Sequence, residues 1–88
     1  MYITLFNSGY KKLLRLDKLK IGEVGILQEP KLINPIIGRL MELGMIKSTT
    51  IVLLGKIFLN NIIQVLIKET SYLCFHQKNA TFFYVYIK

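Results

Sequence analysis

Four short apolar segments, rich in β-branched and aromatic residues, follow one another through the second half of the chain. They span residues 49–55, 62–67, 71–75 and 82–87, and a turn-prone pair, Asn60-Asn61, precedes the second one. Short strands at intervals of roughly ten residues are typical of a meander that curls into a small barrel or sandwich. Closing such a sheet also removes the exposed edges that strands this apolar would otherwise present.

A short helix is predicted ahead of these strands, over residues 35–43. Asn34 can cap it through its side-chain oxygen, and Pro35 occupies the first helical position, where a missing N–H costs nothing. Gly44 follows as the left-handed residue that ends a helix, whereas Gly38 inside the helix costs about 1 kcal/mol relative to alanine. The apolar residues recur at helical spacing and predict one inward stripe, made of Ile36, Ile37, Leu40, Met41 and Leu43.

A further strand is predicted before the helix, over residues 23–31, where an apolar run with Gly22 and Gly25 is closed by Pro30. Residues 76–80 are expected to form one helical or 3₁₀ turn between the last two strands. Five strands with a turn before the last one match the plan of SH3-like barrels. The sequence therefore predicts an all-β fold, an SH3-like small barrel, with one short helix inserted after the first strand.

Length and apolar content limit the functional classes. The 88 residues suit a single domain, and one cysteine, Cys74, allows no internal disulfide. The longest stretch without charge, Ile57 to Ile67, has eleven residues, whereas a membrane-spanning helix needs about 20 apolar residues. The N-terminal segment has its lysines at positions 11 and 12, after its apolar residues, which is not the order of a secretory signal. We therefore expect a cytoplasmic protein.

The net charge of +7 raises the alternative of a nucleic-acid-binding barrel. The basic residues are dispersed, however, and only Lys11, Lys12 and Arg15 cluster. Ten of the twelve are lysine, and arginine is the better reader of phosphates and base edges. Nucleic acid is therefore the alternative partner and not the expected one.

The sequence offers little for catalysis. The five acidic residues form no tight pair, and no phosphate loop or metalloprotease motif is present. Cys74 and His76 would share a face of a strand, but a core thiol and a solvated histidine are the commoner interpretation. We expect no enzyme activity, no catalytic residue, no bound metal and no cofactor.

The last strand carries an aromatic row. Alternation predicts that Phe83, Val85 and Ile87 point into the core. The other face, with Phe82, Tyr84 and Tyr86, then lies outward or beneath the N-terminal segment. If exposed, that row would be an apolar patch of the kind that marks a protein-binding face.

The stretch from Arg39 to Thr49, Arg-Leu-Met-Glu-Leu-Gly-Met-Ile-Lys-Ser-Thr, resembles the motif of the ferrous iron transport protein A family. That motif has Arg-Leu-x-x-Leu-Gly followed by a Gly-Thr-like turn and a strand. Further matches extend the resemblance over residues 16–87: Leu16, Leu19 and Gly22; Gly25 and Ile26; Ala80, Phe83 and Val85. The chain departs from the pattern at Ser48 and Asn61, at Glu69-Thr70, which lacks the usual glycine, and at His76, where arginine is frequent.

The resemblance implies an SH3-like barrel that binds the cytoplasmic side of a FeoB-type ferrous-iron permease with its GTP-binding domain, and supports or regulates it. The membrane would then be reached only through the permease, at its inner face. On this basis we expect the partner-binding surface to comprise Arg39, Glu42, Met45 and Lys47, with Leu40 and Leu43 packed inward.

Other features are left open. Residues 1–15 are predicted to be an N-terminal extension and residues 16–88 the family domain. The apolar strands make a homo-oligomer an open alternative. Similar barrels also occur as terminal domains of iron-dependent repressors, but 88 residues leave no room for a helix-turn-helix beside the barrel.

Overall fold

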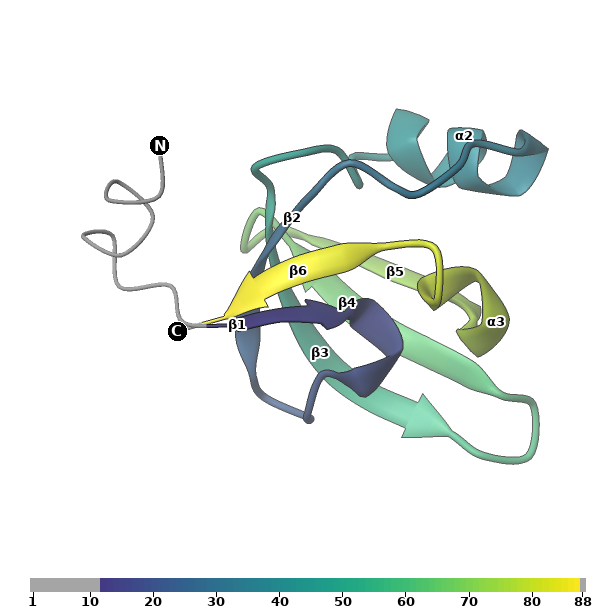
Figure 1. The fold of residues 1–88 in the computed structure, drawn as a ribbon. Helices are drawn as coiled ribbons and strands as arrows, with labels where there is room; N and C mark the ends of the chain where they lie inside the picture. Colours follow the sequence, from purple (N-terminus) through teal and green to yellow (C-terminus); the bar gives the residue numbers. More distant parts are fainter. Residues whose placement is uncertain (1–11, 88) are drawn as a thin grey trace.

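The computed structural model describes residues 12–87. The strands are β1 (Lys12–Arg15), β2 (Val24–Leu27), β3 (Thr50–Ile57), β4 (Ile62–Ile67), β5 (Ser71–His76) and β6 (Tyr84–Ile87) (Figure 1). The helical segments are the 3₁₀ turn η1 (Leu16–Lys18), α2 (Pro35–Glu42) and the single turn α3 (Gln77–Ala80). The strands predicted from residue 49 onward are confirmed, as is the turn before the last strand. Among the described residues, no helix is long and apolar enough to cross a bilayer.

The six strands form one antiparallel sheet in the order β1-β6-β2-β3-β4-β5. The sheet curls on itself, so that β6 and β1 lie in front of β3 and β4 in Figure 1. The connection from β2 to β3 carries α2, which projects from one side of the barrel (Figure 1). The predicted SH3-like small barrel with one short helix is confirmed. The helix follows the second strand, β2, and not the first as predicted, because β1 precedes the strand that was expected to open the sheet.

The sheet includes one strand that the sequence analysis did not predict. Lys12–Arg15 was placed in an N-terminal extension, but it pairs with β6 from Lys12 opposite Ile87 to Arg15 opposite Tyr84. The physical reason is that β6 would otherwise leave one edge unpaired, and β1 covers it. The barrel therefore begins before Leu16, and residues 1–11 of the predicted extension lie outside the described part of the chain.

The core lies between the inner faces of the sheet. On β6 and at the residue before it the predicted alternation is confirmed, because Phe83, Val85 and Ile87 are buried. Gly25 on β2 lets this strand approach β6 closely, since a Cβ there would lie 3.0 Å from the Cβ of Val85. Leucine, isoleucine and valine side chains from η1, α2, β3 and β4 complete one continuous cluster.

Helix α2 begins and ends where the sequence predicts. The Asn34 side chain accepts a hydrogen bond from the Ile37 N–H at 2.8 Å, and Pro35 follows as the first helical residue. Gly44, at φ +120°, ends the helix. The Gly44 N–H donates to the Met41 carbonyl and the Met45 N–H to the Leu40 carbonyl, which is the Schellman pattern.

Two side-chain predictions are wrong. Within the predicted stripe of α2, Ile36 and Leu43 are 52% and 51% exposed, so only Ile37, Leu40 and the partly buried Met41 face the core. Cys74 is exposed and not a core thiol. It lies opposite the exposed Gln64 of β4, because the inward positions of β5 are taken by Leu73 and Phe75.

Candidate functional site

The predicted partner-binding residues lie on and just after α2, and three of the four are at the surface. Arg39 and Glu42 are exposed on the helix, and Lys47 is exposed in the connection to β3. The ion pair recorded among residues 12–87 joins Arg15 to Asp17 and involves neither Arg39 nor Glu42. Both α2 charges are therefore presented to solvent without an ion-pair partner in this part of the chain.

Met45, the fourth predicted contact, is fully buried. The residue after the helix-ending glycine in a Schellman motif commonly packs on the last turn of the helix, and Met45 together with the buried Leu40 fits this rule. The expectation that Met45 projects from the loop is wrong, because the same glycine that ends the helix turns the next side chain inward.

Apolar side chains surround the charged residues of α2, and sequence reasoning assigned them no partner-binding role. Ile36 and Leu43 are about half exposed, and Ile46 is 42% exposed. Leu32 and Ile33, in the connection that enters the helix, are 49% and 62% exposed. We call the exposed side chains of residues 32–47 the α2 surface. Its sequence signal is that apolar residues occupy more of the helix circumference than one buried stripe can use.

Local rules hold the α2 surface in place. The helix is fixed at its N-terminus by the Asn34 cap and at its C-terminus by the Schellman hydrogen bonds. Beyond the helix, the Thr49 hydroxyl donates to the Gly44 carbonyl at 3.3 Å, and the Ser48 N–H donates to the Leu27 carbonyl at 2.8 Å. The surface is thus a defined, mixed apolar and charged face on a capped helix.

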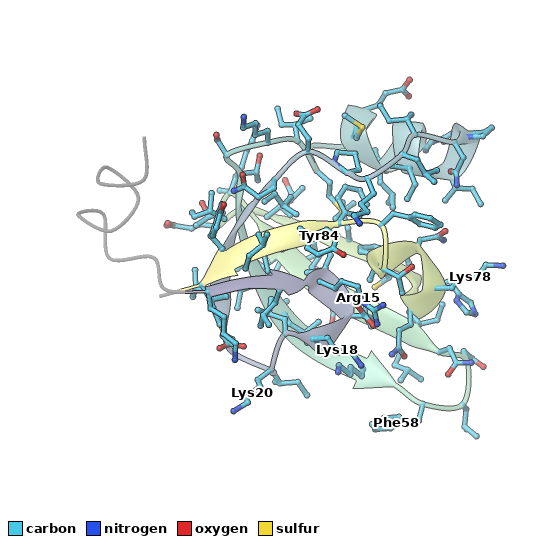
Figure 2. All side chains as sticks on the ribbon, in the orientation of Figure 1. Arg15, Lys18, Lys20, Phe58, Lys78 and Tyr84 are labelled. Carbon is cyan, nitrogen blue, oxygen red and sulfur yellow. The ribbon has the colours of Figure 1, made fainter. Side chains whose placement is uncertain are left out.

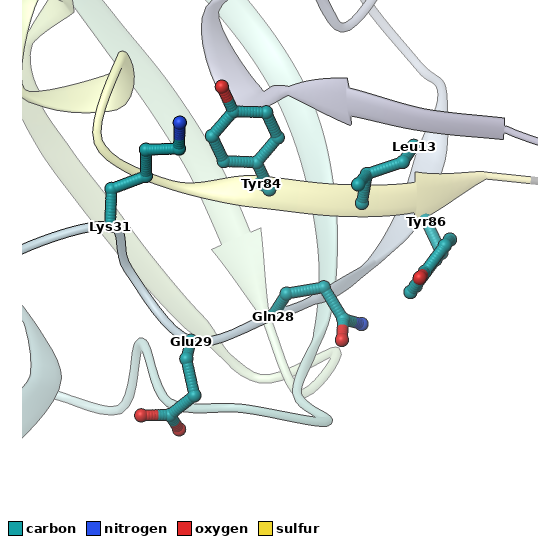
Figure 3. Close-up of a pocket in the computed structure, with 6 residues that line it drawn as sticks. All are labelled: Leu13, Gln28, Glu29, Lys31, Tyr84 and Tyr86. Carbon is teal, nitrogen blue, oxygen red and sulfur yellow. The ribbon is translucent and has the colours of Figure 1, made fainter.

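A second surface feature is an open pocket of about 410 Å³ on the outer face of β6. It is lined by Leu13, Gln28, Glu29, Lys31, Tyr84 and Tyr86 (Figure 3). The Lys31 ammonium lies 5.3 Å from the centre of the Tyr84 ring, a cation–π distance. The predicted outward orientation of Tyr84 and Tyr86 is thereby observed, but both rings are half-buried and form no protruding aromatic patch.

Backbone hydrogen bonds hold the wall of this pocket. The Gln28 N–H donates to the Tyr84 carbonyl at 2.8 Å, and the Lys31 N–H donates to the Phe82 carbonyl at 2.9 Å. In Figure 3 the Glu29 carboxylate points away from the Tyr84 ring. The exposed Lys31 ammonium thus contacts an aromatic face, and the ion pair found among residues 12–87 does not include it.

The side chains that could take part in catalysis or metal binding make structural hydrogen bonds instead. Nδ1 of His76 accepts from the Lys78 N–H at 3.1 Å and so caps α3. The Arg15 guanidinium donates to both carboxylate oxygens of Asp17, at 2.9 and 2.8 Å, and these hydrogen bonds raise the pKa of Arg15. Within residues 12–87, no three His, Cys, Asp or Glu side chains come together as a metal site.

Comparisons with known proteins identify a family and a shared fold. The sequence model of one family, described as the FeoA domain, matches residues 14–81. No curated protein matches the chain. The solution NMR structure of an FeoA protein from Chlorobium tepidum superposes with a TM-score of 0.75 at 23% identity, covering 84% of this chain and 70% of that one.

Two further solved structures have the same fold. A crystal structure described as iron uptake regulatory protein (FeoA) gives a TM-score of 0.72 at 16% identity, covering 86% of this chain and 97% of that one. A manganese-dependent transcriptional repressor gives 0.75 at 16% identity, covering 86% of this chain but only 42% of the repressor. At these identities the likeness concerns the fold alone, which in the repressor is one part of a longer chain.

Proposed function

The chain belongs to the FeoA domain family, and from that premise we propose that it is an accessory protein of ferrous iron uptake that acts by binding. Family membership supports the role in ferrous iron uptake. Its partner would be the cytoplasmic, GTP-binding part of the ferrous-iron permease, which it supports or regulates without catalysing a reaction itself.

The α2 surface is the observation that carries this proposal. Half-exposed Ile36, Leu43 and Ile46 provide apolar area, and exposed Arg39 and Glu42 provide charges of both signs. Protein-binding faces combine an apolar centre with a polar rim, and arginine is enriched among their strongest contacts. A helix capped at both ends also presents these side chains with little loss of conformational freedom on binding.

The apolar residues are expected to contribute most of the affinity. Truncating a buried interface anchor costs about 2 kcal/mol or more, whereas a charge at the rim mainly changes association rate and salt dependence. Leu43→Ser should therefore weaken binding more than Arg39→Glu does, and only the latter effect should shrink as salt is raised.

The test is the affinity of this protein for the cytoplasmic domain of its host's ferrous-iron permease, measured by titration calorimetry with and without guanine nucleotide. Variants Arg39→Glu and Leu43→Ser change the α2 surface. Controls Lys68→Glu and Tyr72→Ser make a similar charge reversal and apolar deletion in and beside the β4–β5 turn, at exposed positions.

Binding that both α2 variants weaken by tenfold or more, while the controls leave it unchanged, would support docking through α2. Equal losses in variants and controls would place the contact elsewhere. Absence of binding under all nucleotide conditions would refute direct docking. Tight binding to DNA or RNA that falls steeply with salt would instead favour the nucleic-acid alternative.

A further inference from the structure

The turn between β3 and β4 carries the most exposed apolar side chains of the described chain. Phe58 is 83% exposed and Leu59 is 95% exposed, and the preceding Ile57 is 53% exposed. Figure 2 labels Phe58 at the end of this hairpin, on the side of the barrel away from α2. We call residues 57–61 the hairpin tip.

The hairpin tip is held to the barrel by its neighbours. The Gln77 N–H at the start of α3 donates to the Asn61 carbonyl at 2.6 Å, and β4 pairs with β5 immediately after the tip, Ile62 opposite His76. Asn61, at φ +53°, adopts the left-handed conformation that asparagine tolerates better than other non-glycine residues. Phe58 and Leu59 are thus presented on an anchored turn.

Lysines accompany the hairpin tip. Lys56 precedes the hairpin tip on β3. Lys78 lies on α3, and the first residue of α3, Gln77, hydrogen-bonds to Asn61 of the tip. Lys18 ends η1, which packs against α3, and Lys20 follows two residues later. In Figure 2, Lys18 and Lys20 lie in the half of the molecule away from α2, and Lys78 projects outward beside α3.

Acidic side chains offset these lysines only in part. Asp17 is nearly buried and paired with Arg15. Glu23 lies close to Lys20, whose backbone N–H donates to its carboxylate, but its single negative charge is outnumbered by the four lysines. Glu29 and Glu42 belong to the segment around α2, and Glu69 lies in the β4–β5 turn, at the opposite end of β4 from the tip. The side that carries the tip is therefore basic around an apolar point.

We propose that the hairpin tip inserts into the interface of an anionic lipid bilayer, with Phe58 and Leu59 among the acyl chains and the lysines at the headgroups. Interfacial binding needs only this combination of buried apolar area and attraction to anionic lipid. A specific protein interface buries on the order of 1,000 Å² or more. Two or three side chains supply only a few hundred Å², because even a large aromatic ring buries about 150–250 Å². The tip therefore suits a lipid surface better than a protein partner or a second copy of this chain.

The chain contains no tryptophan, so one introduced tryptophan reports on its own position. Phe58→Trp places it in the hairpin tip. The control Tyr72→Trp places it on β5 near the opposite end of the β4–β5 hairpin, at a position 65% exposed. Both proteins are titrated with vesicles of phosphatidylglycerol and phosphatidylethanolamine and with vesicles of phosphatidylcholine alone, each with and without brominated acyl chains.

The expected result is a blue shift and bromine quenching of the tryptophan at position 58 with anionic vesicles only, and neither effect at position 72. Co-sedimentation with anionic vesicles is measured in the parent sequence, which has no tryptophan. The double substitution Phe58→Ser and Leu59→Ser should reduce the vesicle affinity at least tenfold. It should fall about fivefold for each lysine replaced by glutamine among Lys18, Lys20, Lys56 and Lys78. The matched control, Leu32→Ser combined with Ile33→Ser on the α2 side, should leave vesicle binding unchanged.

Three results would overturn the proposal. One is no binding to either vesicle. Another is vesicle binding without quenching at position 58, which would mean adsorption by charge alone. The third is concentration-dependent self-association in the absence of lipid that the Phe58→Ser, Leu59→Ser variant abolishes, since a second copy would then occupy the tip. None of these measurements involves the permease, so their failure leaves the proposed docking through α2 untouched.

Discussion

Replacing Met45 by alanine should destabilise the fold strongly, whereas the same change at the next residue, Ile46, should not. Met45 has no exposed surface and lies in the core cluster with Leu40. Ile46 is 42% exposed and belongs to the α2 surface. The two positions are adjacent in the sequence, so their comparison separates a core role from a contact role.

The expected loss for Met45→Ala is about 2–5 kcal/mol, which combines the lost transfer free energy of the thioether chain with the cavity left behind. Domains are stable by roughly 0.05–0.15 kcal/mol per residue, which for 88 residues amounts to roughly 4–13 kcal/mol. The substitution thus removes a large share of the total. For a domain of this size, a loss of about 3 kcal/mol lowers Tm by roughly 12–24 °C.

The measurement is urea unfolding followed by circular dichroism, with thermal unfolding in parallel, for the parent protein and both variants. Ile46→Ala should change the free energy of unfolding by less than about 1 kcal/mol, because half of its side chain already meets water. Equal and small losses in the two variants would refute the core placement of Met45. They would restore it as a surface contact of the kind that the sequence predicts.

Three glycine-related changes test the local backbone. Gly38→Ala should stabilise the protein by about 0.5–1 kcal/mol, because alanine is the better helix former and the nearest atom to the new Cβ is Ile33 Cγ2 at 3.7 Å; a lower urea midpoint would show that the helix needs the smaller residue. Ser48→Gly should also stabilise, by about 0.5–1 kcal/mol, because Ser48 has φ +74°; an unchanged Tm would mean that its side chain offsets the strain. Gly44→Ala should cost about 2–4 kcal/mol, since φ is +120° and the new Cβ would meet Ile67 Cδ1 at 2.9 Å; a loss below about 1 kcal/mol would contradict that clash.

Helix α2 could be predicted almost to the residue because its limits are set by neighbours in the sequence. The Asn34 cap, Pro35 and Gly44 act within one helical turn of the positions that they define. The interior orientation of β6 could be predicted for a similar reason, since alternation along one strand needs no knowledge of its partner. The left-handed φ of Ser48 could be expected for a similar local reason, because the family pattern has glycine at this position.

Strand β1 could not be predicted, because its pairing with β6 joins residues separated by almost the whole chain. The prediction of which β5 side chains face the core was wrong for a different reason. Leu73 and Phe75 or Tyr72 and Cys74 could equally form the inward pair by alternation alone. The register with β4 decides, because it sets Cys74 opposite the outward Gln64.

The α2 surface was underestimated because a helical repeat of apolar residues was interpreted as a single buried stripe. The barrel has room for only part of that repeat, so Ile36 and Leu43 remain outside. Such a surplus differs from a packing error, since the helix is capped at both ends and its inward residues Ile37 and Leu40 are buried in the core. Under the proposed function, these excess apolar residues belong to the partner-binding surface, and the fold does not need them.

The two proposed surfaces have complementary positions. The α2 surface and the hairpin tip lie on different sides of the barrel, one beside β2 and the other beyond β3 and β4 (Figure 1). A protein held at the lipid surface by Phe58 and Leu59 would direct α2 away from the bilayer, toward a cytoplasmic domain of a membrane protein. Confinement to the membrane raises the effective concentration of a partner there without any new contact between the two proteins. A weak contact at α2 would then suffice for occupancy at the membrane, which fits a surface whose apolar residues are only half exposed.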